Sequence, residues 1–194
     1  MAAVNTPDQA PLRKPRADAL RNQVRLLDTA KAVFAEKGID ASMDEIARAA
    51  GVGSGTLYRH FPNRDALIEA VYRNEMDQLA AAAAHLAETL PPIAALRAWM
   101  LLFVDTMGTK HVMATALTAL PGGPAALYAA SGAQVQTSIA MLTGNAVSHG
   151  DINLDIEPME ILRAIAAVAS SGRNWQPNAR KLVDILIAGL RAST

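Results

Sequence analysis

Glycine and proline divide this chain into segments, and within each segment the apolar residues recur at the spacing of a helix. In residues 18–37 they fall at steps of three and four, the period of one helical face: Leu20, Val24, Leu27, Ala30 and Phe34. Gly38 follows in the C-cap position that glycine favours. Alanine dominates the apolar residues and aromatic residues are only 4%, so the enrichment typical of sheets is missing. The sequence therefore predicts an all-α fold.

The same punctuation predicts about nine helices. They cover residues 18–37, 43–50, 56–60, 64–90, 93–108, 111–120, 125–148, 158–171 and 178–191. The sharpest breaks are Pro91-Pro92 and the run at residues 121–124. Residues 1–17 contain three prolines and three basic side chains, so we expect a disordered basic arm that touches DNA phosphate or serves as a solubilising tail.

Composition argues against several classes of protein. The chain has no cysteine, which excludes disulfides, thiol catalysis and cysteine-type zinc sites. Its four histidines are scattered without two-histidine metal spacing, no Ser/His/Asp arrangement is evident, and the acidic residues at 151–160 lack a calcium-loop pattern. We therefore expect no metal, no cofactor and no enzyme activity. No signal peptide or apolar run of about 18 residues is present, so a cytoplasmic protein without a membrane span is expected.

Residues 42–60 carry the features of a helix-turn-helix. Ser42 and Glu45 form a capping-box pattern that starts one short helix, and Gly51 ends it. Ala47 and Ala50 are small enough to let a second helix cross closely. That second helix would present its N-terminal end, with its free backbone N–H groups, to DNA.

The distribution of charge fits the same reading, although the net charge is zero. Residues 12–64 hold ten basic and six acidic side chains, whereas residues 76–194 hold seven basic and eight acidic ones. A basic front on a nearly neutral body is typical of a DNA-binding head.

Residues 42–67 read SMDEIARAAGVGSGTLYRHFPNRDAL, and this run resembles the head of the TetR family of transcriptional regulators. The resemblance covers about residues 20–75. It implies a helix-turn-helix DNA-binding domain at 18–75 and a helical domain at 76–194 that binds a ligand and dimerises. Family members tend to be repressors that bind palindromic double-stranded DNA operators as homodimers and respond to a small effector; activation remains open.

The resemblance also implies the DNA-binding residues. They are Ser42, Gly53, Ser54, Gly55, Thr56, Tyr58, Arg59, His60 and Arg64. A lysine is common in the family at position 54 or 55, so its absence here shifts the expected base readout to Arg59. Packing for Tyr58 and helix capping for His60 remain alternatives. A ligand-binding or nonspecific DNA-binding protein without operator readout remains the rival function.

Bulky, soft side chains on the middle helices are candidates for an apolar effector pocket, with plain core packing as the alternative. They are Trp99, Phe103, Met107, Met113, Leu117 and Met141, with Tyr128, Gln134, Thr137 and Asn145 as polar additions. The last two helices carry apolar stripes that would pair two protomers or complete the core of one. These stripes are Ile161, Ile165, Val168, Val183, Leu186 and Leu190.

Overall fold

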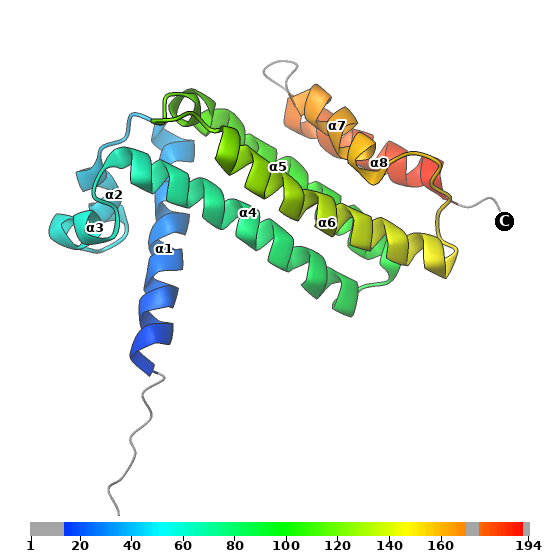
Figure 1. Ribbon diagram of the computed structural model, residues 1–194, viewed down its shortest axis with the longest axis horizontal. Coiled ribbons are helices and arrows are strands. Elements are labelled where there is room, and N and C mark those ends of the chain that lie inside the picture. Colours follow the sequence, from blue (N-terminus) through cyan, green and yellow to red (C-terminus); the bar gives the residue numbers. More distant parts are fainter. Residues whose placement is uncertain (1–13, 170–174, 192–194) are drawn as a thin grey trace, which may run out of the picture.

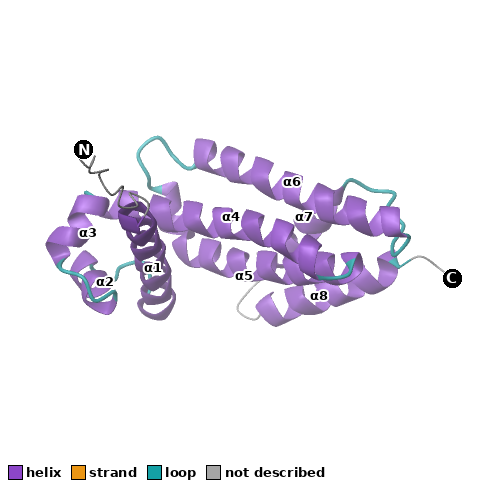
Figure 2. Cartoon of the chain, turned by 90° about the horizontal axis from the view of Figure 1, so that it is seen from below, coloured by secondary structure: helices purple, strands orange, loops and turns teal. Residues whose placement is uncertain are grey.

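In the computed structural model the described residues, 14–169 and 175–191, form eight helices, and the all-α prediction is confirmed. Figures 1 and 2 show a small head of three helices joined to a longer helical body. The helices are α1 (Lys14–Lys37), α2 (Met43–Ala49), α3 (Ser54–His60), α4 (Arg64–Thr89), α5 (Pro92–Thr118), α6 (Ala125–His149), α7 (Pro158–Ala169) and α8 (Trp175–Leu190).

The head is held by a small apolar core and by two glycines that close its turns. Phe34 of α1, Ile46 of α2 and Leu57 of α3 are buried together with Phe61. Gly38 (φ 83°) and Gly51 (φ 67°) adopt the left-handed conformation in which a Cβ would be strained. The two predicted breaks therefore have a direct conformational cause.

The body consists of the long helices α4, α5 and α6, with α7 and α8 packed along them (Figure 2). Trp99 of α5 is fully buried, and its indole N–H donates to the Leu79 carbonyl of α4 at 2.8 Å. Arg180 of α8 donates to both carboxylate oxygens of Asp105 on α5, at 2.5 and 2.6 Å. These contacts fix both α4 and α8 to the same central helix, α5.

The prediction of a helix break near Gly108 was wrong, because α5 continues from Pro92 to Thr118. Glycine inside a helix costs only about 1 kcal/mol relative to alanine. At Gly108 the bare backbone lies against the ring of Trp175, which a Cβ would approach at 3.8 Å. A Cβ at that distance would be in ordinary van der Waals contact, so the packing against α8 accommodates Gly108 without requiring glycine there. Two predicted helices are one, which accounts for eight helices in the described residues instead of nine.

Two helix starts lie three or four residues earlier than predicted. Helix α1 begins at Lys14 and α8 at Trp175, so Pro15 and Pro177 stand in first turns, where the missing N–H of proline costs nothing. Most of the predicted arm, residues 1–13, lies outside the described residues.

Helix α4 passes from the head into the body without a break, so residue 75, the predicted end of the first domain, lies inside it. Three elements meet there. Glu75 of α4, only 6% exposed, lies 2.5 Å from the ammonium of Lys31 on α1, and accepts a 3.3 Å hydrogen bond from Thr109 on α5. The side chains of Asn74 and Gln78 also donate to Asp28 of α1. This junction ties the head to two body helices at once.

Within the described ranges, none of the helices has the length and apolar character needed to cross a bilayer.

Candidate functional site

A complete capping box sets the start of α2. The Glu45 carboxylate accepts from the Ser42 backbone N–H at 2.8 Å, and the Ser42 hydroxyl accepts from the Glu45 N–H at 3.2 Å. The backbone hydrogen bond from Ser42, together with the ammonium of Lys37 at 3.2 Å, lowers the pKa of Glu45 to about 2. The Ser42 hydroxyl is therefore already engaged at the helix start.

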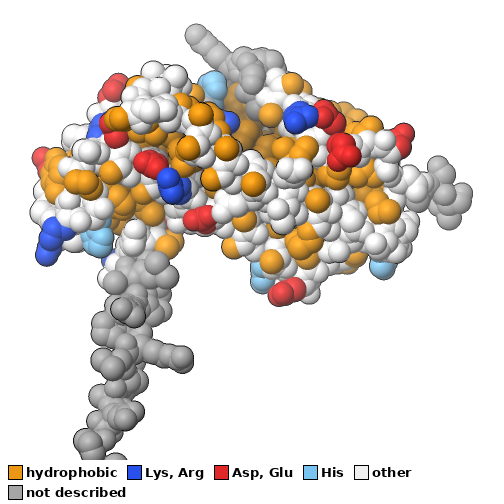
Figure 3. All heavy atoms as spheres, in the orientation of Figure 1, with side chains coloured by type: hydrophobic (Ala, Val, Ile, Leu, Met, Phe, Trp, Pro, Cys, Tyr) orange, Lys and Arg blue, Asp and Glu red, His pale blue; other side chains and the backbone are white. Residues whose placement is uncertain are grey.

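Helix α3 lies on the outer side of the head, anchored from beneath. Leu57 is fully buried, while Tyr58 (47% exposed), Arg59 and His60 project outward. Figure 3 shows basic and histidine side chains at the lower tip of this end of the molecule. The structure thus brings three of the predicted DNA-binding side chains onto one exposed surface.

The N-terminus of α3 leaves its backbone accessible. Its N-cap, Gly53, has no side chain to satisfy the first N–H groups, and Gly53, Ser54 and Gly55 are all exposed. An added Cβ at Gly53 or Gly55 would meet nothing within 4 Å, so neither glycine is needed for packing inside the protomer. Such an uncapped, exposed helix start can accept the phosphate of a nucleic acid.

Two of the predicted side chains are held by bonds within the head. The Ser54 hydroxyl donates to Asp44 at 2.6 Å, which ties α3 to α2. The guanidinium of Arg59 donates to the Gly55 carbonyl at 3.2 Å and to the Thr56 hydroxyl at 3.0 Å. Neither partner of Arg59 carries a charge, so the cation is held along α3 without being neutralised.

Arg64 lies differently from the other predicted residues. Its guanidinium points inward, donating to the Ala41 carbonyl at 2.5 Å and lying 5.7 Å from the centre of the Phe34 ring. One of its nitrogens is buried without a hydrogen-bond partner. In this conformation Arg64 fastens the start of α4 to the loop before α2 and does not lie on the exposed surface of α3.

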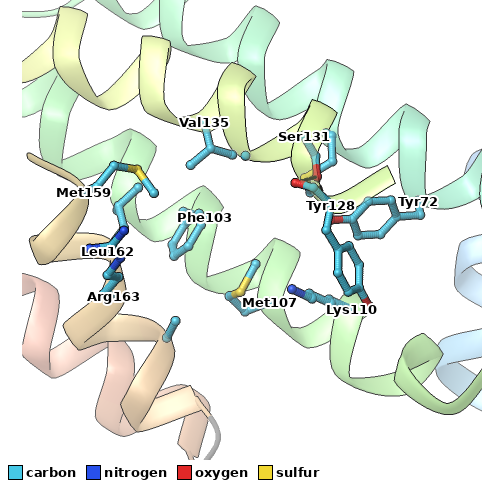
Figure 4. Close-up of a pocket in the computed structure, with 13 residues that line it drawn as sticks. Tyr72, Phe103, Met107, Lys110, Tyr128, Ser131, Val135, Met159, Leu162 and Arg163 are labelled. Carbon is cyan, nitrogen blue, oxygen red and sulfur yellow. Dashed lines mark hydrogen bonds between the residues drawn. The ribbon is translucent and has the colours of Figure 1, made fainter. Parts of the chain in front are cut away.

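Behind the head, a cavity of about 190 Å³ opens among α4, α5, α6 and α7 (Figure 4). Three of the predicted effector-pocket residues line it: Phe103 and Met107 of α5, and the polar candidate Tyr128 of α6. Trp99, Met113 and Leu117 do not, because each is fully buried against the core. Met141 is exposed and faces a different groove, on the alanine-rich sides of α4 and α6.

The cavity also contains residues that the sequence reading passed over. Lys110 follows Phe103 and Met107 on the same face of α5, at the helical spacing of four and three, and that register is the signal that identifies it. Its ammonium lies 4.3 Å from the centre of the Tyr128 ring. Burial lowers the pKa of Lys110 and raises that of Tyr128.

A pair of hydroxyls closes one wall of the cavity. Ser131 donates to the Leu127 carbonyl at 3.0 Å, so its only proton is used there. The Tyr72 hydroxyl lies 3.0 Å from the Ser131 oxygen, where either hydroxyl could donate; with the Ser131 proton on the carbonyl, Tyr72 is the donor. Burial raises the pKa of Tyr72 and keeps it a donor.

The predicted dimerisation stripes divide between core and edge. Ile161, Ile165 and Val183 are buried within the protomer, and Val168, Leu186 and Leu190 are half-buried against its core. The outer face of α7 and α8 carries other residues, all exposed and mostly small: Ala164, Ala167, Ile185, Ala188 and Gly189. Ile185, 66% exposed, is the largest apolar side chain on that face.

Comparison with known proteins agrees with this two-part geometry. Residues 26–71 match the bacterial regulatory proteins of the TetR family, and residues 91–192 match the C-terminal domain of SbtR-like transcriptional regulators. The chain is 42% identical to a TetR transcriptional regulator of Streptomyces coelicolor, with a TM-score of 0.80 over 89% of this chain and 99% of that one.

Two further relatives extend the comparison. A TetR transcription regulatory protein of Mycobacterium vanbaalenii is 31% identical, with a TM-score of 0.72 over 91% of this chain and 99% of that one. An HTH-type transcriptional regulator of Staphylococcus aureus is 43% identical over 70 residues, which is 34% of this chain and 36% of that protein. The chain thus spans only about a third of this curated relative. All of these relatives are transcriptional regulators and not enzymes. From the head motif, the fold and both matched domains, we conclude that this chain belongs to the TetR family of transcriptional regulators.

Proposed function

We propose that this protein is a repressor that binds a palindromic operator as a homodimer and that a small molecule in the cavity of its body releases it from DNA. One observation carries the proposal, and it is the exposed surface of α3. This short helix carries Tyr58, Arg59 and His60 in its second half and has no side-chain cap at its start. The cavity lies against α4, the helix that continues into the head. A cytoplasmic location, where operator DNA is accessible, belongs to the same proposal.

The contacts with DNA would divide into two kinds. The backbone at Gly53, Ser54 and Gly55 is exposed and would accept phosphate, which positions α3 without reading sequence. Arg59 has the length and the charge to reach a guanine edge, after giving up two weak bonds to neutral partners. Tyr58 and His60 would add contacts on either side. For Ser42 and Thr56 we propose hydroxyl contacts at the rim, and for Arg64 a phosphate contact that requires its inward side chain to turn.

A dimer is needed for a palindrome, and the outer face of α7 and α8 supports one. Small residues there would let the same two helices of a second protomer approach closely, with Ile185 at the centre. We expect Ile185→Glu to yield monomers in sedimentation velocity and to lose operator binding. Val147→Glu, at a similarly exposed apolar position on α6, is the matched control and should stay dimeric.

The decisive experiment is selection of binding sites from a randomised double-stranded DNA pool at near-physiological salt. We expect a palindrome with half-sites about one helical turn apart. The rival function, binding to DNA without operator readout, is favoured by the absence of long side chains at Ser54 and Gly55. It would give no enriched sequence and a steep salt dependence with equal affinity for random DNA, and that result would refute the proposal.

A further inference from the structure

The cavity among α4, α5, α6 and α7 combines apolar walls with two cationic side chains (Figure 4). Phe103, Met107, Val135 and Leu162 supply apolar side chains on several sides. Among the described residues that line it, Lys110 and Arg163 are charged, and neither Asp nor Glu is present. Any ligand that fills this space therefore meets positive charge without a competing carboxylate.

The two cations are not equivalent. Arg163 is 68% exposed at the side-chain level and forms an ion pair with Glu160, one turn away on α7. Lys110 has no carboxylate partner in the part of the chain that the structure describes, and its ammonium rests against the face of Tyr128. A cation–aromatic contact stabilises an ammonium less than an ion pair in a desolvated site does. Lys110 is thus the group with unused capacity to bind an anion.

The neighbouring hydroxyls do not compete for this role. Ser131 is bonded to a backbone carbonyl and the Tyr72 hydroxyl is bonded to Ser131, so both hydroxyls already have partners within the protein. The strongest donor left at this wall is the Lys110 ammonium.

We propose that the cavity binds small monocarboxylic acids with an apolar body about the size of one aromatic ring, and that Lys110 binds the carboxylate. The inference rests on the proposed function in one respect, namely that the bound acid is the effector. It narrows the sequence-based expectation of an apolar effector to an amphipathic anion. One free cation matches one negative charge; a dicarboxylate or a phosphate would bring a second charge without a partner.

The size of the cavity sets the body of the ligand. A protein cavity of about 150 Å³ holds one benzene molecule. At about 190 Å³, this cavity has room for one ring and a short acid chain. Burial, which lowers the pKa of Lys110, also means that a bound carboxylate would stabilise the ammonium by replacing solvation that the pocket removes.

The test compares an acid with its neutral isostere, using the full chain and isothermal titration calorimetry. The probes are 3-phenylpropanoate and 3-phenylpropanamide, which share ring and chain length. We expect the acid to bind at least about tenfold more tightly, as a charge-assisted hydrogen bond would give. Lys110→Met should abolish this preference while leaving amide binding in place, and Lys110→Arg should retain the preference. Lys181→Met, an exposed lysine on α8, is the matched control and should change nothing.

Three results would overturn the inference: equal binding of acid and amide by the unmodified chain, a preference that survives Lys110→Met, or no saturable binding of the acid at millimolar concentration. Amide binding by Lys110→Met, with an unchanged unfolding midpoint, shows that the cavity is intact. Release of operator DNA is measured separately. An acid that binds without releasing DNA refutes the effector role alone, whereas release by the amide and not by the acid refutes the ligand class alone.

Discussion

The junction between Lys31 and Glu75 gives a quantitative prediction about how the head is attached to the body. Lys31→Met leaves the Glu75 carboxylate, 6% exposed, with one neutral donor, Thr109, at 3.3 Å. Removing one partner of a buried ion pair costs about 3–5 kcal/mol. Because Lys31 is itself 39% exposed, water can reach part of this site, and we reduce the expected cost to about 2 kcal/mol.

The measurement is urea unfolding followed by circular dichroism at fixed protein concentration, comparing midpoints at an unchanged slope. The double variant Lys31→Met/Glu75→Leu should recover most of the loss, because an apolar pair replaces the ion pair. Arg73→Met is the matched control: its partner Glu69 is 41% exposed, one helical turn away, and we expect a cost below about 0.5 kcal/mol.

Two outcomes would refute this reasoning. If Lys31→Met and Arg73→Met destabilise the protein equally, burial of Glu75 contributes nothing to the strength of the pair. If the double variant loses as much stability as Lys31→Met alone plus Glu75→Leu alone, Lys31 and Glu75 are not coupled at all.

Four further predictions concern the head. Arg59→Ala should weaken binding to the selected operator by about 1–3 kcal/mol and relax sequence preference, measured by fluorescence anisotropy; unchanged affinity and preference would remove Arg59 from the interface. Gly51→Ala, with a Cβ in open space but φ at 67°, should cost about 1–2 kcal/mol of stability from backbone strain alone. Gly55→Ala should instead stabilise the fold slightly and weaken DNA binding, and normal DNA affinity would argue against close backbone approach there. The pKa of Glu45, lowered from 4.5 to about 2, means that its contribution is present above pH 4.5 and is lost as pH falls toward 2; unfolding midpoints against pH should show this, and a Glu45→Gln variant with the same acid loss would contradict it.

Local features of the head could be predicted from the sequence because their causes are local. The capping box needs only Ser42 and Glu45 three residues apart, and the turn at Gly51 needs only a residue that tolerates positive φ. Leu57 and its exposed neighbours follow from helical period once that turn is placed.

The body was harder to predict because its determinants are distant in sequence. Gly108 looks like a helix end until Trp175 of α8 is seen against it. Trp99 and Phe103 are both bulky side chains on α5, yet only Phe103 borders a void, and where packing leaves a void is a tertiary property. Lys110 was overlooked because the predicted break after Gly108 placed it outside any helix, whereas the continuous α5 places it in register with Met107 on the cavity side.

The continuity of α4 has a mechanical consequence. Met76, near the middle of the helix, borders the cavity, and Arg64 stands at the end next to α3. Twelve residues separate them, a lever arm of about 18 Å at about 1.5 Å per residue. A tilt of about 5° at the cavity would therefore displace the far end by about 1.5 Å. In a two-fold dimer the displacement would act on both heads. The distance between the α3 helices of the two protomers could therefore change by about 3 Å without a hinge in either chain.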